Sequence, residues 1–176
     1  TLVVPYLGYA RQDKKFNPGE PLSARAIARV FSHGVSRVFT VNVHDRRVLT
    51  HFGVSAQDIS LAAEIGRYLS SQPFTNPLIL APDDGAAEFA SQVAGTCGWQ
   101  HDHLEKVRIT GDEVRIEPKH LEVKDRDVVI VDDIISTGGT LATSAAMLGA
   151  QGAKSVSSVC VHGVLAEGAY IRLLAK

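Results

Sequence analysis

Residues 128–140 read VVIVDDIISTGGT and form the most informative segment of the chain. Its apolar run, residues 128–131, predicts a β-strand that is buried on both faces of a parallel sheet. Asp132 and Asp133 follow where we expect the strand to leave the sheet, and a helical pattern covers residues 141–148. This order predicts an α/β unit with a ligand site at the carboxyl end of the strand.

The turn between the strand and the helix is built from small residues, Ser136, Thr137, Gly138, Gly139 and Thr140. Without bulky side chains, backbone N–H groups can close around an anion at a helix N-terminus. Asp132 and Asp133 are suited to holding sugar hydroxyls or a metal beside a phosphate. The alternative is that these aspartates only cap the helix. Because acids and loop are contiguous, we favour a site for a phosphorylated sugar.

Composition describes an ordinary globular protein. The chain has 176 residues, 45% hydrophobic and 21% charged, with a formal net charge of −1. That length allows one domain or two small ones, and the charge gives no indication of a nucleic-acid or membrane partner. Cys97 and Cys160 lie in apolar contexts without metal-ligand spacing, which predicts buried free thiols in a reducing compartment. With no membrane span or signal peptide visible, we expect a cytoplasmic protein.

Strand and helix patterns alternate along the chain, which predicts an α/β fold with mainly parallel sheets flanked by helices. We expect strands at 2–4, 35–43, 77–81, 128–131 and 155–161, and extended segments at 99–109 and 113–116. We expect helices from a cap at Ser23 to Gly34, and at 59–69, 87–96, 141–148 and 166–174. Polar groups follow four of the strands, where ligands of such sheets collect.

Residues 82–86, PDDGA, repeat the design of strand, acids, small residues and helix. They could form a second anion or metal–phosphate site, and the alternative is helix capping by Asp83 or Asp84. Because the chain has another phosphate loop, we favour a polyphosphate site that the two loops share. His44 directly follows a predicted strand, a position that allows a metal role besides a structural one.

Cationic and amide side chains form two further candidates. Lys106 and Arg108 alternate in a predicted strand, which places the two cations about 6–7 Å apart on one side. They could straddle a transferring phosphoryl group, or they could line the solvated face of an edge hairpin. Arg11 and Gln12 offer the forked donors and the amide that a nucleotide would use, in a loop that otherwise reads as a surface loop.

Residues 5–15, PYLGYARQDKK, and 21–25, PLSAR, resemble the nucleotide-binding segment of the ribose-phosphate pyrophosphokinase (PRPP synthetase) family. The resemblance continues in the family's order through His44, residues 83–86 and residues 106–108. Residues 128–140 resemble the signature that phosphoribosyltransferases share with PRPP synthetases. The similarity covers essentially the whole chain, and residues 16–20 and 124–127 are similar to archaeal members.

The resemblance implies two phosphoribosyltransferase-like domains. Residues 1–58 would be the remainder of an N-terminal domain whose start is missing. Residues 59–176 would be the C-terminal domain that carries the signature, with its last strand and helix missing. It also implies a homo-oligomer in which a neighbouring subunit lines the adenine pocket.

The implied reaction moves the β,γ-diphosphoryl group of Mg-ATP to the 1-hydroxyl of ribose 5-phosphate and gives PRPP and AMP. In the family's roles, Arg11, Gln12 and His44 contact ATP, and His44 with Asp83 binds magnesium. Asp83, Asp84, Gly85 and Ala86 form the pyrophosphate loop, and Lys106 and Arg108 stabilise the transition state. Asp132 and Asp133 hold the ribose, while Ser136, Thr137, Gly138, Gly139 and Thr140 bind the 5-phosphate. Two alternatives stay open: a phosphoribosyltransferase that uses PRPP, and a non-catalytic regulatory protein.

Overall fold

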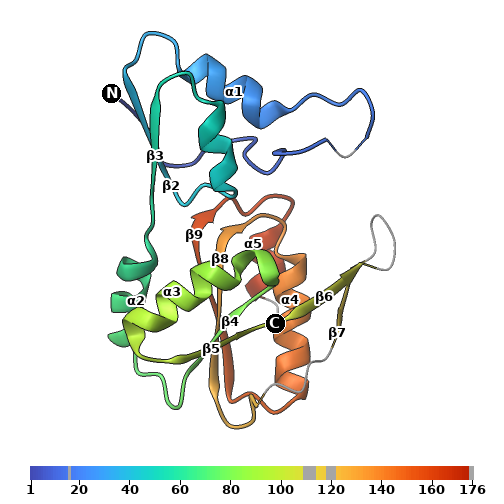
Figure 1. Ribbon diagram of the computed structural model, residues 1–176. Helices are drawn as coiled ribbons and strands as arrows, with labels where there is room; N and C mark the ends of the chain where they lie inside the picture. Colours follow the sequence, from blue (N-terminus) through green and yellow to red (C-terminus); the bar gives the residue numbers. More distant parts are fainter. Residues whose placement is uncertain (16, 109–113, 118–121, 175–176) are drawn as a thin grey trace. The chain divides into compact units, whose positions relative to one another are not determined.

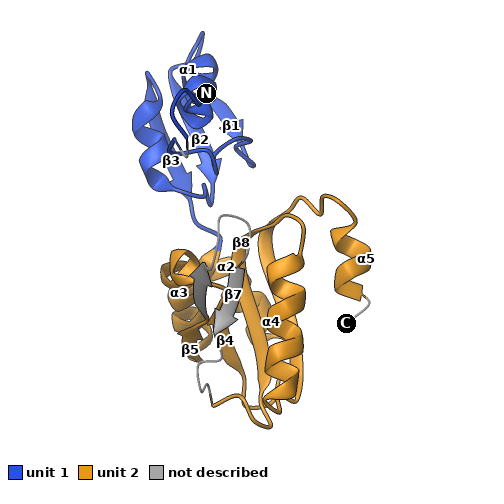
Figure 2. Ribbon diagram, turned by 90° about the vertical axis from the view of Figure 1, so that its right-hand side faces the viewer, with its two compact units in different colours: residues 1–61 blue, residues 62–176 orange. Residues whose placement is uncertain are grey.

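The computed structural model describes residues 1–174 apart from residue 16 and the segments 109–113 and 118–121 (Figure 1). For residues 105–108 and 114–117 it describes the backbone alone. The chain divides into two compact units, Thr1–Leu61 (unit 1) and Ala62–Lys176 (unit 2), coloured separately in Figure 2. Among the described residues, every helix is too short or too polar to span a lipid bilayer.

Unit 1 is built around a parallel three-stranded sheet, with strands in the order β1-β2-β3. Its elements are β1 (Leu2–Val4), α1 (Ser23–Phe31), β2 (Arg37–Val41), the 3₁₀ helix η1 (Arg46–His51) and β3 (Ser55–Ile59). Apolar side chains of α1, β2 and η1, among them Ala28, Val38 and Val48, are buried together and form the core.

Three expectations for unit 1 need correction. The second strand stops at Val41 because Asn42 has a φ of 42°, which breaks the extended backbone. The strand β3 was not predicted, since half of its residues are polar. Ser23 does not cap α1: it is the first helical residue, and its hydroxyl donates to Oε1 of Gln12 at 2.5 Å.

Unit 2 contains a parallel four-stranded sheet, with strands in the order β5-β4-β8-β9, and an antiparallel hairpin formed by β6 and β7. Its elements are α2 (Ala62–Ser70), β4 (Leu78–Ala81), the 3₁₀ helix η2 (Asp84–Ala86), α3 (Ala87–Cys97), β5 (Gln100–His103), β6 (Glu105–Arg108), β7 (Val114–Glu117), β8 (Asp127–Ile135), α4 (Gly139–Ala150), β9 (Ser155–Gly163) and α5 (Ala169–Leu174). The predicted fold class, with mainly parallel sheets flanked by helices, is confirmed.

The central strands β4 and β8 are apolar because helices cover both faces of their sheet (Figure 2). Alternate side chains of a strand point to opposite faces. One set, Ile79, Ala81, Val129 and Val131, packs in the cluster that includes α2 and α3. The other set, Leu78, Leu80, Val128 and Ile130, packs with Leu141 and Leu148 of α4. The expectation of a strand buried on both faces is therefore confirmed.

The strand β8 is longer than its apolar run, and Asp132 and Asp133 lie inside it rather than after it. Its pairing with β4 ends at Leu80 and Ile130, whereas its pairing with β9 continues to Ile135 and Gly163. The two acids therefore stand where β8 has already passed the end of β4. This places them at the carboxyl edge of the sheet, the position where a parallel sheet binds its ligands.

Several predicted boundaries in unit 2 also shift. The helix expected at 59–69 begins only at Ala62, because Ile59 ends β3. The extended segment expected at 99–109 forms two strands, β5 in the main sheet and β6 in the hairpin. Cys97 and Cys160 are free thiols, as expected, but both are half-buried rather than buried.

Candidate functional site

In the acid pair of β8, Asp132 is held in an environment that disfavours its charge. The backbone N–H of Asp133 donates to Oδ1 of Asp132 at 2.9 Å, and both residues are half-buried. Burial raises the pKa of Asp132 to about 8, and the hydrogen bond and negative charge of Asp133 and the charge of Asp83 act in the same direction. A cation or hydroxyl donors placed here would relieve the crowding of negative charge.

The loop after β4 converges on this pair. Asp83 adopts an extended backbone and its Oδ1 accepts a hydrogen bond from the N–H of Gly85 at 3.1 Å, so it caps η2. The capping alternative is therefore correct for Asp83, while its charge also reaches Asp132 of the adjacent strand. Since β4 and β8 are neighbours in the sheet, their two acidic loops meet at one edge. The structure thus brings Asp83 and Asp132 together as the sequence predicted.

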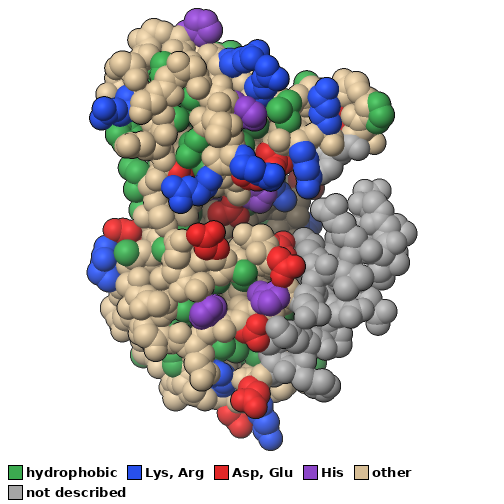
Figure 3. Space-filling view, in the orientation of Figure 1, with side chains coloured by type: hydrophobic (Ala, Val, Ile, Leu, Met, Phe, Trp, Pro, Cys, Tyr) green, Lys and Arg blue, Asp and Glu red, His purple; other side chains and the backbone are tan. Residues whose placement is uncertain are grey.

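His103, which is not among the predicted site residues, lies at the same edge. His103 is the last residue of β5, in register with Ala81, the last residue of β4. Its Nε2 lies 3.1 Å from Oδ1 of Asp84, and its Nδ1 lies 3.5 Å from Oδ1 of Asp102. Figure 3 shows histidine and acidic side chains close together on this face of unit 2. The signal available in the sequence was its position at the end of a strand.

The loop of residues 136–140 opens the helix α4 without a side-chain cap. Gly138 is the N-cap residue, with a φ of 71°, and as a glycine it supplies no side-chain cap to the N–H groups of the first turn. The alternative that the aspartates cap this helix is therefore wrong. A Cβ at position 138 would be strained at that φ and would lie 3.2 Å from Cγ of Leu173. The arrangement leaves backbone donors at the helix N-terminus, as an anion site requires.

The remaining candidates belong to unit 1. Gln12 is half-buried, and its backbone C=O accepts from the N–H of Ala24 at 3.3 Å while its side chain accepts from Ser23. Arg11 and His44 are exposed. The amide of Gln12 is thus fixed against the start of α1, and the guanidinium of Arg11 faces solvent.

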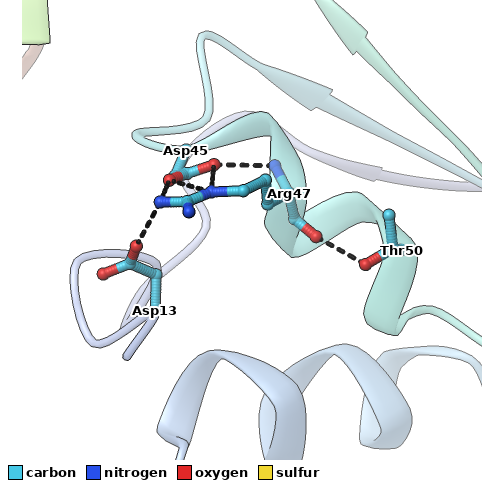
Figure 4. Close-up of polar contacts among 4 residues, drawn as sticks. All are labelled: Asp13, Asp45, Arg47 and Thr50. Atoms are coloured by element: carbon cyan, nitrogen blue, oxygen red, sulfur yellow. Dashed lines mark hydrogen bonds and ion pairs between the residues drawn. The ribbon is translucent and has the colours of Figure 1, made fainter. Parts of the chain in front are cut away.

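An arginine links the Arg11–Gln12 loop to the turn that carries His44 (Figure 4). Asp45 caps η1 by accepting from the N–H of Arg47 at 2.8 Å. The guanidinium of Arg47 returns to the Asp45 carboxylate, with Nε 2.8 Å from Oδ2, and its Nη2 lies 3.3 Å from Oδ2 of Asp13. Asp13 directly follows Gln12, so unit 1 brings its predicted nucleotide loop and the His44 turn to one edge.

Replacing Arg47 by methionine is expected to return the pKa of Asp45 toward 3.8. The hydrogen bond from Arg47 is the largest cause that lowers this pKa, to about 2, and burial acts against it. Carbonyl chemical shifts of Asp45 followed by NMR between about pH 1.5 and 6 would measure the change. A pKa that stays near 2 in the variant would show that another group holds the carboxylate ionised.

Lys106 and Arg108 occupy alternate positions of β6, paired with Ile116 and Val114, and their side chains lie outside the described part of the structure. Within the described residues, no group of three histidine, cysteine or acidic side chains is arranged to hold a metal ion. Arg11, Gln12 and His44 lie in unit 1, and the other predicted site residues lie in unit 2.

Comparison with known proteins identifies the family. The model for the phosphoribosyl transferase domain matches residues 56–172, and the model for the N-terminal domain of ribose phosphate pyrophosphokinase matches residues 1–34. The ribose-phosphate pyrophosphokinase of Methanosarcina acetivorans is 51% identical over 172 residues, covering 98% of this chain and 60% of the relative. That of Methanopyrus kandleri is 47% identical over 175 residues, covering 99% and 60%.

A solved structure supports the same family relationship. The phosphoribosylpyrophosphate synthetase from Mycobacterium smegmatis matches with a TM-score of 0.82 and 29% identity, covering 97% of this chain and 56% of that one. The chain spans about 60% of the length of the curated relatives named above. With a family model over most of its length, the chain belongs to the phosphoribosyl transferase domain family and is a homologue of the archaeal ribose-phosphate pyrophosphokinases.

Proposed function

We propose that the complete protein is a ribose-phosphate diphosphokinase, which transfers the β,γ-diphosphoryl group of ATP to the 1-hydroxyl of ribose 5-phosphate and releases AMP. The observation that carries this proposal is the meeting of two acidic loops at one sheet edge, with the charge of Asp83 acting on Asp132. A sugar phosphate alone needs only one of these loops. A second loop of the same design next to it supports a polyphosphate partner.

In this proposal the loop of residues 136–140 binds the 5-phosphate through its backbone N–H groups. Asp132 and Asp133 accept hydrogen bonds from the ribose 2- and 3-hydroxyls. Burial and the neighbouring Asp133 raise the pKa of Asp132, and hydroxyl donors would stabilise its ionised form. The anomeric hydroxyl of the sugar is then directed toward the loop of residues 83–86.

The transfer joins the sugar O1 to the β-phosphorus and breaks the bond between that phosphorus and the oxygen that leaves with AMP. Such a reaction needs positioning and charge neutralisation more than covalent participation of the protein. We assign the neutralising cations to Lys106 and Arg108, and contacts with the nucleotide to Arg11 and Gln12.

Magnesium is part of the same proposal, and the residues fit it. Mg²⁺ takes few protein ligands and completes its shell with phosphate oxygens and water, so a cluster of three protein ligands is not required. The crowded negative charge around Asp83 and Asp132 is the environment that a divalent cation would stabilise. Asp83 would hold the ion, which would offset charge on the phosphates of ATP when bound, and the resemblance to the family assigns His44 as a further ligand.

The wider organisation is proposed from the resemblance to the same family. Residues 1–58 would form the remainder of the N-terminal domain and residues 59–176 the C-terminal one. The complete protein would act as a homo-oligomer in the cytoplasm, with neither nucleic acid nor membrane as a partner.

Incubating the full-length protein with ATP, Mg²⁺ and ribose 5-phosphate tests the proposal. The expected result is formation of AMP and PRPP in equal amounts. A phosphoribosyltransferase would instead consume PRPP only when a base is added and would form no AMP from ATP. Binding of both substrates without turnover would show a regulatory protein and would overturn the catalytic assignment.

Replacing His44 or Asp83 by alanine is expected to raise the Mg²⁺ concentration that ATP binding requires, while ribose 5-phosphate binding changes much less. The reason is that both residues are assigned to the metal of the ATP complex. Titration calorimetry of each variant with each ligand measures the effect, and Asp83→Asn separates charge from the cap on Gly85. Equal losses for both ligands would assign these residues a supporting structural role.

A further inference from the structure

The chain that follows β9 returns to the loop of residues 136–140 and contacts its backbone through hydrogen bonds. We call residues 164–174 the backing segment. Its first N–H groups bond to the end of β8 and the start of the loop: Leu165 N–H donates to the Ile135 C=O and Ala166 N–H to the Ser136 C=O, both at 3.1 Å. Its helix α5 then places Arg172 against the Thr137 C=O and Leu173 beside Gly138.

These bonds fix the direction of peptide groups in the loop. The peptide bonds of this loop are trans, and in a planar trans peptide the C=O and the following N–H point in opposite directions. The bond from Ala166 therefore directs the Thr137 N–H away from the backing segment. The bond from the Arg172 guanidinium does the same for the Gly138 N–H. Two successive donors of the loop are thus turned toward the side where an anion binds.

Arg172 orients the peptide group between Thr137 and Gly138 and contributes little to the packing of the core. Its side chain is exposed, so it adds little to the core, and its Nη2 lies 3.4 Å from the Glu167 C=O at the start of the same turn. The second contact anchors the guanidinium within the backing segment. Gly138, which follows the bonded carbonyl, has the positive φ that such a turned peptide demands.

We propose that Arg172 is a positioning residue that sets the direction of the Gly138 N–H and so prepares the loop to bind the phosphate of its substrate. The identity of that substrate as ribose 5-phosphate rests on the proposed function. Arg172 acts through the Thr137 carbonyl, from the side opposite the anion.

The test compares Arg172→Met and Arg172→Lys in the full-length protein, with Arg67→Met as the matched control. Arg67 is also an exposed arginine near the end of a helix of unit 2, and its side chain pairs with Glu64 at 2.7 Å, outside the site. Calorimetry measures the Kd for ribose 5-phosphate and for Mg-ATP. Amide ¹H–¹⁵N spectra of the ligand-free protein report on Thr137 and Gly138, and thermal unfolding reports on stability.

For Arg172→Met we expect the Kd of ribose 5-phosphate to rise about tenfold. The amide signals of Thr137 and Gly138 should shift, and the Kd of Mg-ATP and the unfolding temperature should stay near those of the unmodified protein. Arg172→Lys should restore part of the affinity, because its ammonium can donate to the same carbonyl. The control should change none of these readouts.

Unmoved amide signals together with an unchanged Kd for ribose 5-phosphate would overturn the proposal. Equal losses for both ligands, or a large fall in unfolding temperature, would also overturn it, since they would indicate a general structural role. If the unmodified protein does not bind ribose 5-phosphate but the amide signals still move in Arg172→Met, the proposed function fails and the positioning role stands.

Discussion

Replacing Lys106 or Arg108 by alanine is expected to lower kcat by roughly 10²–10⁴-fold with a much smaller change in KM. In the proposed reaction, charge on the diphosphoryl group is redistributed as the group moves from AMP to the sugar. An oriented cation would stabilise the transition state of this transfer more strongly than it stabilises the bound substrate. Losing one such interaction in a site that excludes water costs on the order of 3–5 kcal/mol.

Steady-state kinetics of the full-length protein, with AMP formation as the readout, measure this effect. Val107→Ala is the matched control, since Val107 lies between the two cations in β6 and is expected to affect packing but little chemistry. Variants that keep a near-normal kcat with a raised KM would show that Lys106 and Arg108 bind ATP in the ground state, and the assigned role in the transition state would be wrong.

Replacing both Asp132 and Asp133 by asparagine is expected to weaken ribose 5-phosphate binding by roughly 10²–10⁴-fold, because hydrogen bonds to charged groups contribute about 1.5–3 kcal/mol each. The fold should persist, since the two acids are only half-buried and lie beyond the buried apolar run Val128 to Val131 of β8. Calorimetry with ribose 5-phosphate measures the loss, and Glu64→Gln on α2 serves as a surface control. Unchanged affinity in a folded double variant would remove these residues from the sugar site.

For the single variant Asp132→Asn we expect a pH-dependent change in stability. The pKa of Asp132 is raised from 3.8 to about 8, so between these pH values the folded protein keeps a proton that the unfolded chain has released. The free energy of unfolding therefore falls as pH rises: the contribution is fully present below 3.8 and lost as pH passes 8. Asparagine cannot ionise, so this variant should unfold at a higher temperature than the unmodified protein at about pH 9, with a smaller difference at about pH 5. An equal or lower unfolding temperature at the higher pH would contradict the raised pKa.

The sequence predicted the features that depend on local pattern. An uninterrupted apolar run, as in residues 128–131, is stable only with both sheet faces covered, and helices do cover them. The parallel arrangement then brought strand ends to one edge, which is why the meeting of Asp83 with Asp132 could be expected before the structure was known.

Features that depend on tertiary contacts were missed. The strand β3 contains Asp58, whose carboxylate accepts from Thr40 at 2.6 Å and from the N–H of Val43 at 3.0 Å, so long-range bonds offset its polar composition. Ser23 bonds to Gln12 across a loop instead of capping its own helix. Arg172 donates to the C=O of Thr137, which lies 35 residues earlier in the chain, and no local pattern predicts that contact.

The unequal pairing of β8 has a consequence for how the unit opens. Residues 128–130 are in register with strands on both sides, while residues 132–135 pair with β9 and no longer with β4. Amide hydrogens of the first part that bond to β4 should exchange with solvent only through unfolding of the whole unit, whereas amide hydrogens of the second part that bond to β9 should exchange also when β9 alone separates. One continuous strand thus joins the most slowly exchanging region of the unit to a region of lower local opening energy. The acid pair lies in the second region, where its backbone can adjust to a ligand while the core stays closed.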